Sequence, residues 1–318
     1  MTVAVAMALY NGARFIEEQL DCIRLQSQKV DRVVMCDDGS KDDTVNIVKK
    51  YIEKYDLAET WSLHINEQNL GYIKNFYKAM TLCEEDLIFL ADQDDIWELD
   101  KVEKMTKVMK DNTSITLLSS KYGIIDGEGN RIKTVMHEES KEKETCTSVQ
   151  VIDIMRAYNW PGMAMCVRRS FFTEIYDSLK EHKIPHDLAF AIIAADRDSF
   201  YEYDYVGVYH RRHNNNTAKE EHRIFKLLNK ERKVAEIEET RSQLLNIINA
   251  KLDIQKVSSD LIEYKINYLN KRHGCLSNAK VIDLFKLYKN DSQKMLRLAS
   301  FLCDFWIVTI GRFFRKAI

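Results

Sequence analysis

The sequence predicts an α/β fold, a sheet flanked by helices, followed by an α-helical appendage. Short β-rich runs alternate with segments of helical periodicity through the first half of the chain, which is typical of a sheet with crossover helices on its faces. After about residue 217 the chain is rich in Lys, Glu, Leu and Ile at helical spacing, without a convincing strand. We therefore expect a main domain over residues 1–216 and a helical region over residues 217–318.

Four apolar runs, each followed by polar residues, are the strand candidates. They span residues 3–9, 32–36, 62–65 and 87–91. In open α/β sheets, ligands bind outside the carboxyl ends of the strands. We therefore expect the functional site at that edge of the sheet.

The segments between and after these strands carry apolar residues at helical spacing. The expected helices span residues 15–25, 45–55, 73–82 and 102–109, with further helical segments over 225–268 and 281–298. Ser40 and Asp43 form a capping-box-like start for the second helix. Residues 126–130, D-G-E-G-N, have the chemistry of a hairpin turn.

The composition argues against some classes of protein. With 318 residues, 45% of them hydrophobic and 30% charged, the chain fits a globular protein made of one domain and an appended module. A net charge of -2 argues against binding nucleic acid mainly by neutralising its phosphates, so we expect no nucleic-acid partner. The seven cysteines are scattered and form no C-x-x-C pair, which indicates reduced thiols in a cytosolic protein.

Both ends of the sequence bear on membrane association. Residues 2–9 lack a basic stretch and run directly into Y-N-G, so they indicate a first strand and not a signal peptide. No run reaches the roughly 18–20 apolar residues that cross a bilayer. Residues 301–316 combine aromatic and apolar side chains with a basic end. They indicate either an interfacial segment on a membrane or a terminal helix docked on its own domain or on a dimer partner.

Two acidic clusters follow expected strands: D-D-G-S at residues 37–40 and D-Q-D-D at residues 92–95. Neighbouring carboxylates repel one another, and a hard cation with oxygen ligands relieves that repulsion. Mg²⁺ or Mn²⁺ held by one or two carboxylates keeps positions open for phosphate oxygens. The clusters therefore favour a nucleoside diphosphate bound with a divalent cation. Asp42 and Asp43 are interpreted instead as the acidic start of a helix.

Other phosphate-binding motifs are missing from the sequence. It contains no G-x-x-x-x-G-K-[ST] and no G-x-G-x-x-G after a strand. A Walker-type NTPase and a dinucleotide oxidoreductase are therefore disfavoured.

Four motifs, taken in order, resemble those of family 2 glycosyltransferases of the GT-A fold. They are Y-N-G at residues 10–12, C-D-D-G-S at 36–40, N-L-G-Y-I-K-N-F at 69–76 and A-D-Q-D-D-I-W at 91–97. The D-Q-D-D-x-W form looks like the branch that includes bacterial rhamnosyltransferases of polysaccharide assembly. The resemblance spans about residues 1–215 and implies a GT-A domain with a Rossmann-like mixed sheet.

The resemblance implies a set of donor-binding and metal-binding residues. Asp38, with Asp37 beside it, is expected to bind the nucleoside base and ribose near Tyr10. Asp92 and Asp94 are the D-x-D pair, with Asp94 favoured as the direct metal ligand, and Asp95 supports them. The other expected donor contacts are Ala8, Asn11, Asn69, Lys74, Gln93, Arg211 and Arg212.

A later motif implies the catalytic base. His186-Asp187 resembles the family's H-D or E-D pair, in which the Asp accepts the proton of the acceptor hydroxyl, although the residues after the pair, L-A-F, depart from the usual aromatic ones. His186 and Trp160 are expected on the acceptor side, while core packing explains Trp160 equally well. A zinc site formed by His182 and His186 is rejected, because Pro185 opposes a continuous helix between them.

The H-R-R-H-N-N-N stretch at residues 210–216 resembles the motif that closes the catalytic domain, with His210 in place of the usual Tyr. His213 is expected to bind the metal or the diphosphate, and Arg211 and Arg212 to neutralise phosphate charge. A buried hydrogen bond for His213 and a solvated edge for the two arginines remain open alternatives.

Together these features predict an inverting, metal-dependent glycosyltransferase of bacterial surface polysaccharide synthesis. The expected donor is dTDP-rhamnose or a UDP-hexose, the cofactor Mn²⁺ or Mg²⁺, and the acceptor a glycan or lipid-linked oligosaccharide. The expected location is the cytoplasm, with peripheral contact at the inner face of the plasma membrane or a homodimer formed through the C-terminal helices. Two alternatives stay open: a metal-dependent nucleotidyltransferase or phosphohydrolase, and a non-catalytic nucleotide-binding assembly subunit.

Overall fold

The computed structural model describes residues 1–132, 144–213 and 229–309. The chain divides into two compact units. The first contains residues 1–149 and 160–216, and the second contains residues 150–159 and 217–318. The segment 150–159, which the sequence placed in the main domain, thus groups with the C-terminal helices.

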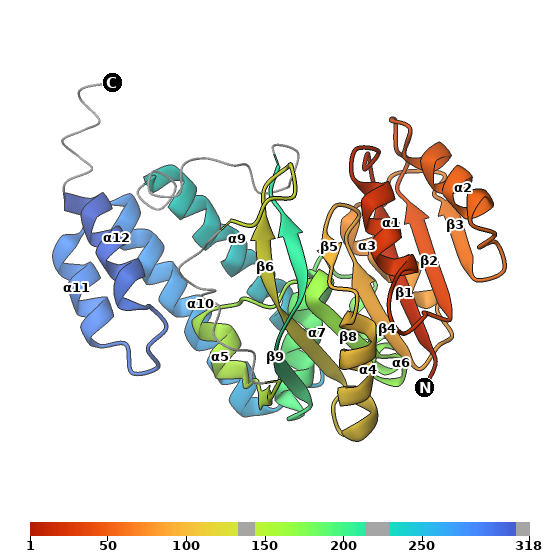
Figure 1. The fold of residues 1–318 in the computed structure, drawn as a ribbon. Coiled ribbons are helices and arrows are strands. Elements are labelled where there is room, and N and C mark those ends of the chain that lie inside the picture. The colour runs from red at the N-terminus through yellow and green to blue at the C-terminus, as the bar shows by residue number, and fades with distance from the viewer. Residues whose placement is uncertain (133–143, 214–228, 310–318) are drawn as a thin grey trace. The chain divides into compact units, whose positions relative to one another are not determined.

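The first unit is built on a mixed sheet (Figure 1). Its parallel half has the order β3-β2-β1-β4 and consists of β1 (Val3–Leu9), β2 (Arg32–Asp37), β3 (Trp61–Ile65) and β4 (Leu87–Ala91). These are the four predicted strands, confirmed to within one residue at each end. Their burial explains the apolar runs, since every residue of β4 and all but one of β1 are buried.

The sheet continues beyond β4 with β8, β6, β9 and β5 in that order, while β7 pairs with β9. Strand β8 runs antiparallel to both β4 and β6, whereas β6 and β9 are parallel. The bounds are β5 (Ile96–Trp97), β6 (Leu117–Ile125), β7 (Cys146–Ser148), β8 (Met165–Arg168) and β9 (Phe200–Arg211). After β6, the amide of Asp126 donates to the Asn130 carbonyl oxygen at 3.0 Å, which confirms the predicted turn.

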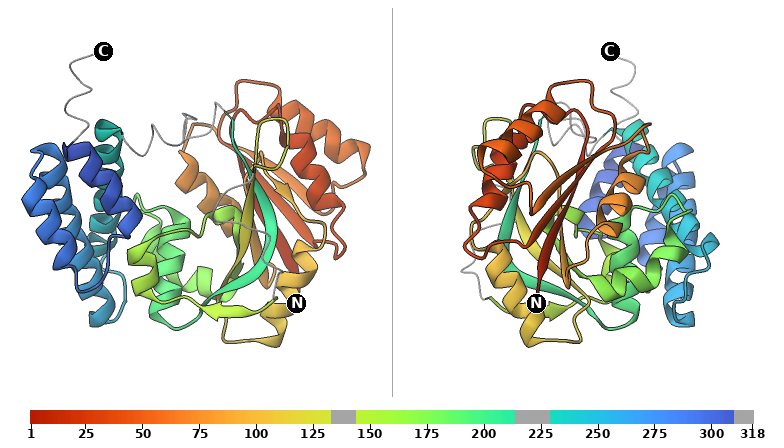
Figure 2. Two further views of the ribbon diagram at one scale, coloured as in Figure 1. Left: turned by 60° about the vertical axis from the view of Figure 1, so that its left-hand side comes forward. Right: turned by 90° about the vertical axis from the view of Figure 1, so that its right-hand side faces the viewer.

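Helices lie on both faces of this sheet (Figure 2). They are α1 (Ile16–Arg24), α2 (Thr44–Lys54), α3 (Tyr72–Thr81), α4 (Lys101–Asp111), α6 (Arg169–Leu179) and α7 (His186–Asp196), with a short 3₁₀ turn η1 (Gly162–Ala164). Helix α1 packs with α2, and α3 packs with α7. The four helices predicted for this part of the chain are confirmed.

The predicted capping box at Ser40 and Asp43 is wrong. Helix α2 begins at Thr44, and Asp43 at its start makes no side-chain capping bond. The Ser40 hydroxyl instead donates to Asp37 at 2.5 Å and accepts from the amide of Asn11 at 2.9 Å. The tertiary contact between the loops after β1 and β2 thus outweighs the local cap.

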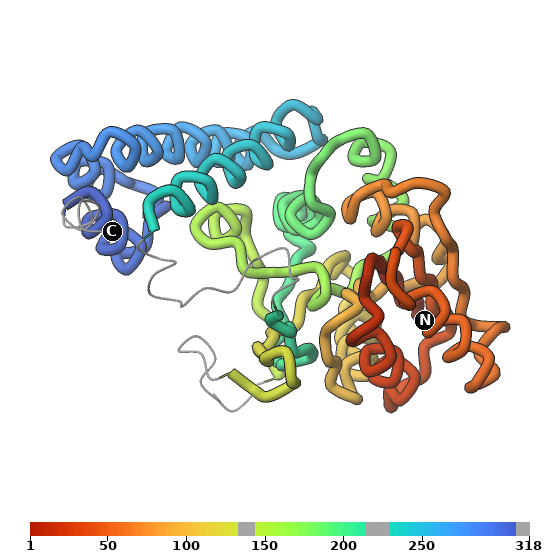
Figure 3. The backbone as a smooth tube through the Cα atoms, turned by 90° about the horizontal axis from the view of Figure 1, so that it is seen from above, coloured from red at the N-terminus to blue at the C-terminus, as the bar shows by residue number. Residues whose placement is uncertain are grey.

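The second unit is helical. It consists of α5 (Val151–Arg156), α9 (Lys230–Asn249), α10 (Lys256–Ser277), α11 (Val281–Lys289) and α12 (Leu298–Thr309). Figure 3 shows α9 and α10 side by side. The predicted helical character is confirmed in the described residues, but each expected segment contains a break, at residues 250–255 and 290–297. Lys251 and Lys294 at these breaks have the left-handed φ values 48° and 52°.

The described part of the C-terminal segment docks on its own unit. The ring of Phe301 on α12 stacks on Tyr288 of α11 with centroids 4.4 Å apart, and Asp304 is fully buried in an ion pair with Arg272 of α10 at 2.6 Å. Of the two interpretations of residues 301–316, this contact favours the docked helix for residues 301–309, while 310–316 lie outside the described residues. None of the described helices combines the length and apolar character that crossing a membrane requires.

Candidate active site

The site lies at the point in the sheet where the strand order reverses, between strands β1 and β4. Strand β1 has β2 on one side and β4 on the other, so the loops after β1, β2 and β4 meet at the edge where open α/β sheets bind ligands. Both acidic clusters follow these strands. The structure therefore brings together the loops that contain residues 10–12, 37–40 and 92–95.

The first acidic loop is saturated with hydrogen bonds from the chain itself. Asp37 and Asp38 are only 1% and 2% exposed. The Asp37 carboxylate accepts the amides of Gly39 and Ser40, both at 3.0 Å. The Asp38 carboxylate accepts the Asn66 side chain and the amides of two residues in the next loop, Leu70 and Gly71, at 2.7–2.9 Å.

This loop also makes hydrogen bonds to the loop after β3. Asn69, predicted as a donor contact, donates from its side chain to the Asp38 carbonyl oxygen at 2.9 Å. Gly71 has a φ of 80°, a conformation that favours glycine, and a Cβ there would meet no atom within 4 Å. Asp37, Asp38 and Asn69 thus hold the loops in shape, and their direct contact with the donor stays a prediction.

The loop after β1 is held by hydrogen bonds from the loops after β2 and β4. The amide group of Gln93 accepts from the backbone of Tyr10 at 2.8 Å and donates to it at 2.9 Å. Asn11, with a φ of 51°, accepts the amide of Lys41 at 2.7 Å. A Cβ at Gly12 would lie 2.3 Å from the Gln93 side-chain oxygen, so a larger residue there would displace Gln93 from its place beside Tyr10. Gln93 and Asn11 therefore act on the backbone, while the Tyr10 side chain stays 49% exposed.

Two other predicted donor residues differ in exposure. Ala8 lies half-buried in β1 opposite Cys36 of β2. Lys74 lies in the first turns of α3 and is exposed. Lys74 therefore remains available to a ligand, whereas Ala8 presents only a methyl group.

In the described part of the chain, the second acidic loop has fewer hydrogen-bond donors around its carboxylates than the first. Asp94 pairs with His213, with Oδ2 and Nε2 2.9 Å apart. Asp95 is 1% exposed, and its Oδ1 accepts from the amide of Arg211 at 3.0 Å and lies 3.1 Å from Nδ1 of His210. Its Oδ2 is buried without a hydrogen-bond partner among the described residues. A buried carboxylate oxygen left unpaired costs free energy.

The pKa values of some groups in and around this loop are shifted. Burial, then the negative charges of Asp95 and Asp94, raise the pKa of Asp92. Burial and the charge of Asp95 also raise the pKa of Asp94, against the effect of His213. Burial alone would lower the pKa of His210, but the hydrogen bond and the charge of Asp95 raise it overall. The loop therefore holds more negative charge than its surroundings stabilise.

The donor set fits a hard divalent cation only in part. Asp94 and His213 supply an oxygen and an imidazole nitrogen at one point, and the unpaired oxygen of Asp95 lies in the same loop. Among the described residues, no three His, Cys, Asp or Glu side chains converge as a metal cage. Two protein ligands with open positions are what Mg²⁺ or Mn²⁺ needs when phosphate oxygens complete its coordination.

The two arginines of the 210–216 motif differ sharply. Arg211 is 2% exposed, and its guanidinium donates to Glu18 at 2.5 Å, to the Asp94 carbonyl oxygen at 2.8 Å and to the Gly127 carbonyl oxygen at 3.3 Å. In the structure Arg211 therefore supports the acidic loop from behind, and its contact with phosphate stays a prediction. Arg212 is half-buried and stays a candidate for phosphate. Residues 214–216 of this motif lie outside the described residues.

The predicted base lies in the first turn of α7. Asp187 is half-exposed and accepts the amide of Leu188 at 2.8 Å. Its negative charge is the last among the influences that raise the pKa of Asp92, after burial and the charges of Asp95 and Asp94.

The two predicted acceptor residues, His186 and Trp160, are less accessible. His186 is 5% exposed, with its ring centroid 4.4 Å from that of Phe76 and both ring nitrogens unpaired among the described residues. His186 therefore packs against Phe76 in the structure, and its contact with the acceptor stays a prediction. Trp160 donates to Glu202 at 2.7 Å and packs edge-on against Phe200. Its half-buried ring leaves both of its predicted roles open.

Comparison with known proteins agrees with this geometry. A profile described as "Glycosyl transferase family 2" matches residues 4–203. The chain belongs to this family. The profile covers the parallel strands, both acidic loops and Asp187, so the resemblance noted in the four motifs is confirmed.

Curated relatives of this glycosyltransferase match only parts of their length. An uncharacterized glycosyltransferase of Methanocaldococcus jannaschii is 32% identical over 145 residues, 45% of this chain and 49% of that protein. The dTDP-rhamnosyl transferase RfbG of Shigella flexneri is 38% identical over 100 residues, 30% of this chain and 34% of that protein. The matched region thus spans about half or less of these two relatives.

Solved structures share the fold of this glycosyltransferase. S. aureus TarS 1–349 in complex with UDP-GlcNAc has a TM-score of 0.62 at 18% identity, covering 99% of this chain and 92% of that chain. The mannosyltransferase PcManGT of Pyrobaculum calidifontis in complex with GDP-Man and Mn²⁺ has a TM-score of 0.60 at 13% identity, covering 99% and 83%. The likeness confirms the predicted GT-A fold with a helical C-terminal region.

Sequence reasoning missed one buried residue of this glycosyltransferase. Lys101 is fully buried, and its Nζ donates to the Met163 carbonyl oxygen at 2.6 Å and lies 3.6 Å from the centre of the Trp97 ring. Burial lowers its pKa to about 7, against the charges of Asp95 and Asp92. The signal was present in the sequence, since Lys101 occupies the buried stripe of α4. Lys101 ties the loop that follows the acidic cluster to the η1 segment near Trp160.

Proposed function

We propose that this glycosyltransferase moves a sugar, rhamnose or another hexose, from a nucleoside diphosphate to a hydroxyl of a glycan, with inversion at the anomeric carbon. dTDP-rhamnose is the first candidate donor, because residues 91–97 resemble rhamnosyltransferases and a dTDP-rhamnosyl transferase is a relative. A UDP-hexose is the second. The proposed acceptor is a lipid-linked oligosaccharide at the cytoplasmic face of the membrane, in bacterial surface polysaccharide synthesis.

One observation carries this proposal: the 92–95 loop holds negative charge that the described residues leave unmatched. Asp95 has a buried oxygen without a partner, and the pKa values of Asp92 and Asp94 are raised. A divalent cation relieves such a cluster, and the cation in turn attracts a diphosphate. The position at the carboxyl ends of β1 and β4 supports the same ligand.

We assign metal binding to Asp94 and His213, with Asp92 beside them. Mn²⁺ or Mg²⁺ bound there supplies charge stabilisation for the departing diphosphate. Because that charge is stabilised, the leaving group needs no protein acid. Lys74, Arg212 and the exposed ring of Tyr10 are the side chains that we assign to the donor.

Asp187 is the proposed base. Its carboxylate, in the first turn of α7, accepts the proton of the acceptor hydroxyl as the oxygen attacks the anomeric carbon. The buried ring of His186 and its contact with Phe76 fix the start of α7 and so the direction of Asp187. Attack on the face opposite the diphosphate gives inversion.

Two variants separate binding from chemistry. Asp187→Asn is expected to spare donor binding and to lower the transfer rate by roughly 10²- to 10⁴-fold, the usual contribution of a general base. Asp94→Ala is expected to weaken donor binding itself, and only when metal is present. Calorimetry with dTDP-rhamnose or UDP-glucose, with and without Mn²⁺, measures binding, and mass spectrometry of the products measures transfer.

Asp43→Asn is the matched control, because Asp43 is exposed near the same edge and bonds only the Asn46 side chain. It is expected to behave as the wild type. Undiminished transfer by Asp187→Asn would refute the assignment of the base. A new nucleotide linkage or free phosphate would point to a nucleotidyltransferase or phosphohydrolase, and donor binding without turnover would point to an assembly subunit.

A further inference from the structure

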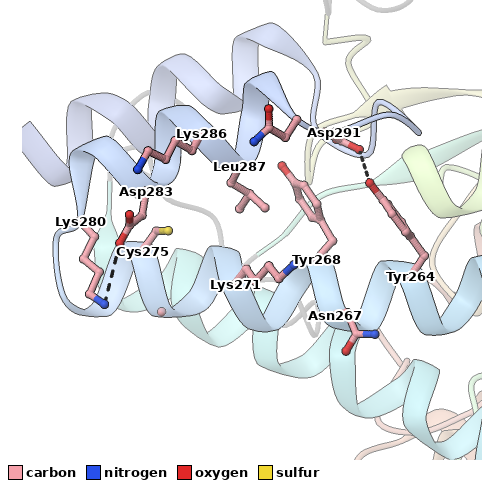
Figure 4. A pocket seen from close by; sticks show the side chains of 12 residues that line it. Tyr264, Asn267, Tyr268, Lys271, Cys275, Lys280, Asp283, Lys286, Leu287 and Asp291 are labelled. Carbon is pink, nitrogen blue, oxygen red and sulfur yellow. Dashed lines mark hydrogen bonds and ion pairs between the residues drawn. The ribbon is translucent and has the colours of Figure 1, made fainter.

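The helical unit contains a cavity of its own, between α10 and α11. It has a volume of about 640 Å³ and is lined by side chains of these two helices and of the residues that follow α11 (Figure 4). A cavity of this size lies in the range of ligand sites in proteins, roughly 300–1,000 Å³. The proposed catalytic site contributes none of its lining residues.

The lining combines aromatic and amide groups. Tyr264 and Tyr268 of α10 point into it (Figure 4), and Asn267 and Asn290 are also among the lining residues. Tyr268 is 4% exposed, and its hydroxyl has no hydrogen-bond partner among the described residues. A buried hydroxyl without a partner costs free energy that a bound polar group recovers. Aromatic faces beside amides match a ring that carries hydroxyl groups.

The lining also carries cations that lack counter-charges. The ammonium groups of Lys271 and Lys286 form no ion pair or hydrogen bond within the described part of the chain. A third lysine, Lys280, is 3.9 Å from Asp283. The other acidic residue of the lining, Asp291, already accepts the Leu296 amide at 3.1 Å and the Tyr264 hydroxyl at 3.3 Å. Two lysines from two helices are therefore available to an anion.

We propose that this cavity binds a phosphorylated carbohydrate. Its phosphate pairs with Lys271 and Lys286, and its ring hydroxyls meet the amide of Asn290 and the hydroxyl of Tyr268. The site is distinct from the proposed transfer site and goes beyond the proposed function. It gives the helical unit a task of its own, which is to hold a sugar phosphate or a phosphate-bearing segment of a glycan.

The test is calorimetry of the full chain with glucose 1-phosphate in the presence of EDTA and without donor, so that metal-dependent binding at the 92–95 loop does not contribute. Lys271→Ala and Lys286→Ala are each expected to lower the affinity about tenfold, the loss of one charge-assisted contact. Tyr268→Phe keeps the ring and is expected to weaken binding by a factor of about three. Circular dichroism of each variant checks that the helices are intact.

Lys289→Ala is the matched control, because Lys289 lies on the same helix three residues after Lys286 and does not line the cavity. It is expected to bind like the wild type. Equal affinity of all variants, or no binding at millimolar ligand, would overturn the proposal. Inorganic phosphate and glucose are titrated separately, and phosphate that binds as tightly as glucose 1-phosphate would remove the carbohydrate from it. Since no turnover is measured, a negative result here leaves the proposed transfer reaction untouched.

Discussion

The two acidic loops at the sheet edge look alike in the sequence and differ in the structure. Around Asp37 and Asp38, every carboxylate oxygen accepts at least one hydrogen bond from the chain. Around Asp92, Asp94 and Asp95, one buried oxygen has no partner in the described residues and two pKa values are raised. The carboxylates of the first loop are fully hydrogen-bonded by the chain, whereas the second loop keeps negative charge that an additional cation would stabilise.

The difference lies in the backbone that surrounds each cluster. The loop after β2 directs its own amides, those of Gly39 and Ser40, at the carboxylates, and the loop after β3 adds the amides of Leu70 and Gly71. The loop after β4 leads directly into β5, and its carboxylates face one another and two histidines. The number of hydrogen-bond partners, more than the number of acidic residues, thus separates a structural cluster from a ligand-binding one.

The largest expected effect is a loss of folding stability on substitution in the first acidic loop. Asp38→Asn removes the charge and one acceptor oxygen from a group that holds Asn66, Leu70 and Gly71. Hydrogen bonds to a charged group contribute about 1.5–3 kcal/mol each, so a loss of about 3 kcal/mol in the free energy of unfolding is expected. Urea denaturation measures it, with Asp43→Asn as the exposed control. A loss below about 0.5 kcal/mol would mean that the loop does not depend on Asp38.

The second expected effect concerns the metal. Mn²⁺ at about 100 times its dissociation constant is expected to stabilise the wild type by about 2.7 kcal/mol, because it binds only the folded state. Asp94→Asn is expected to lose this response, while Asp38→Asn, although destabilised, is expected to keep it. Thermal denaturation with and without Mn²⁺ measures the shift. An equal response of the wild type and Asp94→Asn would place any metal elsewhere.

The smallest expected effect is on the pH dependence of folding stability, which the charge of the second acidic loop causes in the absence of metal. The pKa of Asp92 is raised from 3.8 to about 8, so its protonated form contributes stability below its usual pKa that is lost as the pH rises through about 8. In EDTA, the wild type is therefore expected to lose stability between about pH 4 and about pH 8, and Asp92→Asn to lose less, by on the order of 1 kcal/mol. Urea denaturation across this range measures the slope. Parallel slopes for the two proteins would contradict the raised pKa.

Much of the fold could be predicted from the sequence, while the roles of individual side chains could not. Apolar runs and helical spacing located the four parallel strands and the four helices between and after them. The pairing of Asp94 with His213 follows from motifs that lie 119 residues apart in the chain, and the structure brings them to 2.9 Å. Lys101 was missed, because a lysine in a helix is usually solvated, although it shares the helical spacing of the buried residues Met105 and Met109.

Arg211 and His186 show why residue type alone gives no role. Each matches a functional motif, and each proves to be buried by contacts from distant segments: Glu18 and Gly127 for Arg211, and Phe76 for His186. The break between α9 and α10 is similar, since no proline or glycine marks it in the sequence. Long-range contacts of this kind leave no local pattern.

The sequence by itself determined the four parallel strands, the helices between and after them, the two acidic clusters and the family, because periodicity and short motifs are local properties of the chain. Only the tertiary structure decided which aspartates are satisfied and which are left with unmatched charge. Hydrogen bonding and burial depend on which segments fold against each other, and those contacts join residues up to 193 positions apart, as in the pair of Glu18 and Arg211.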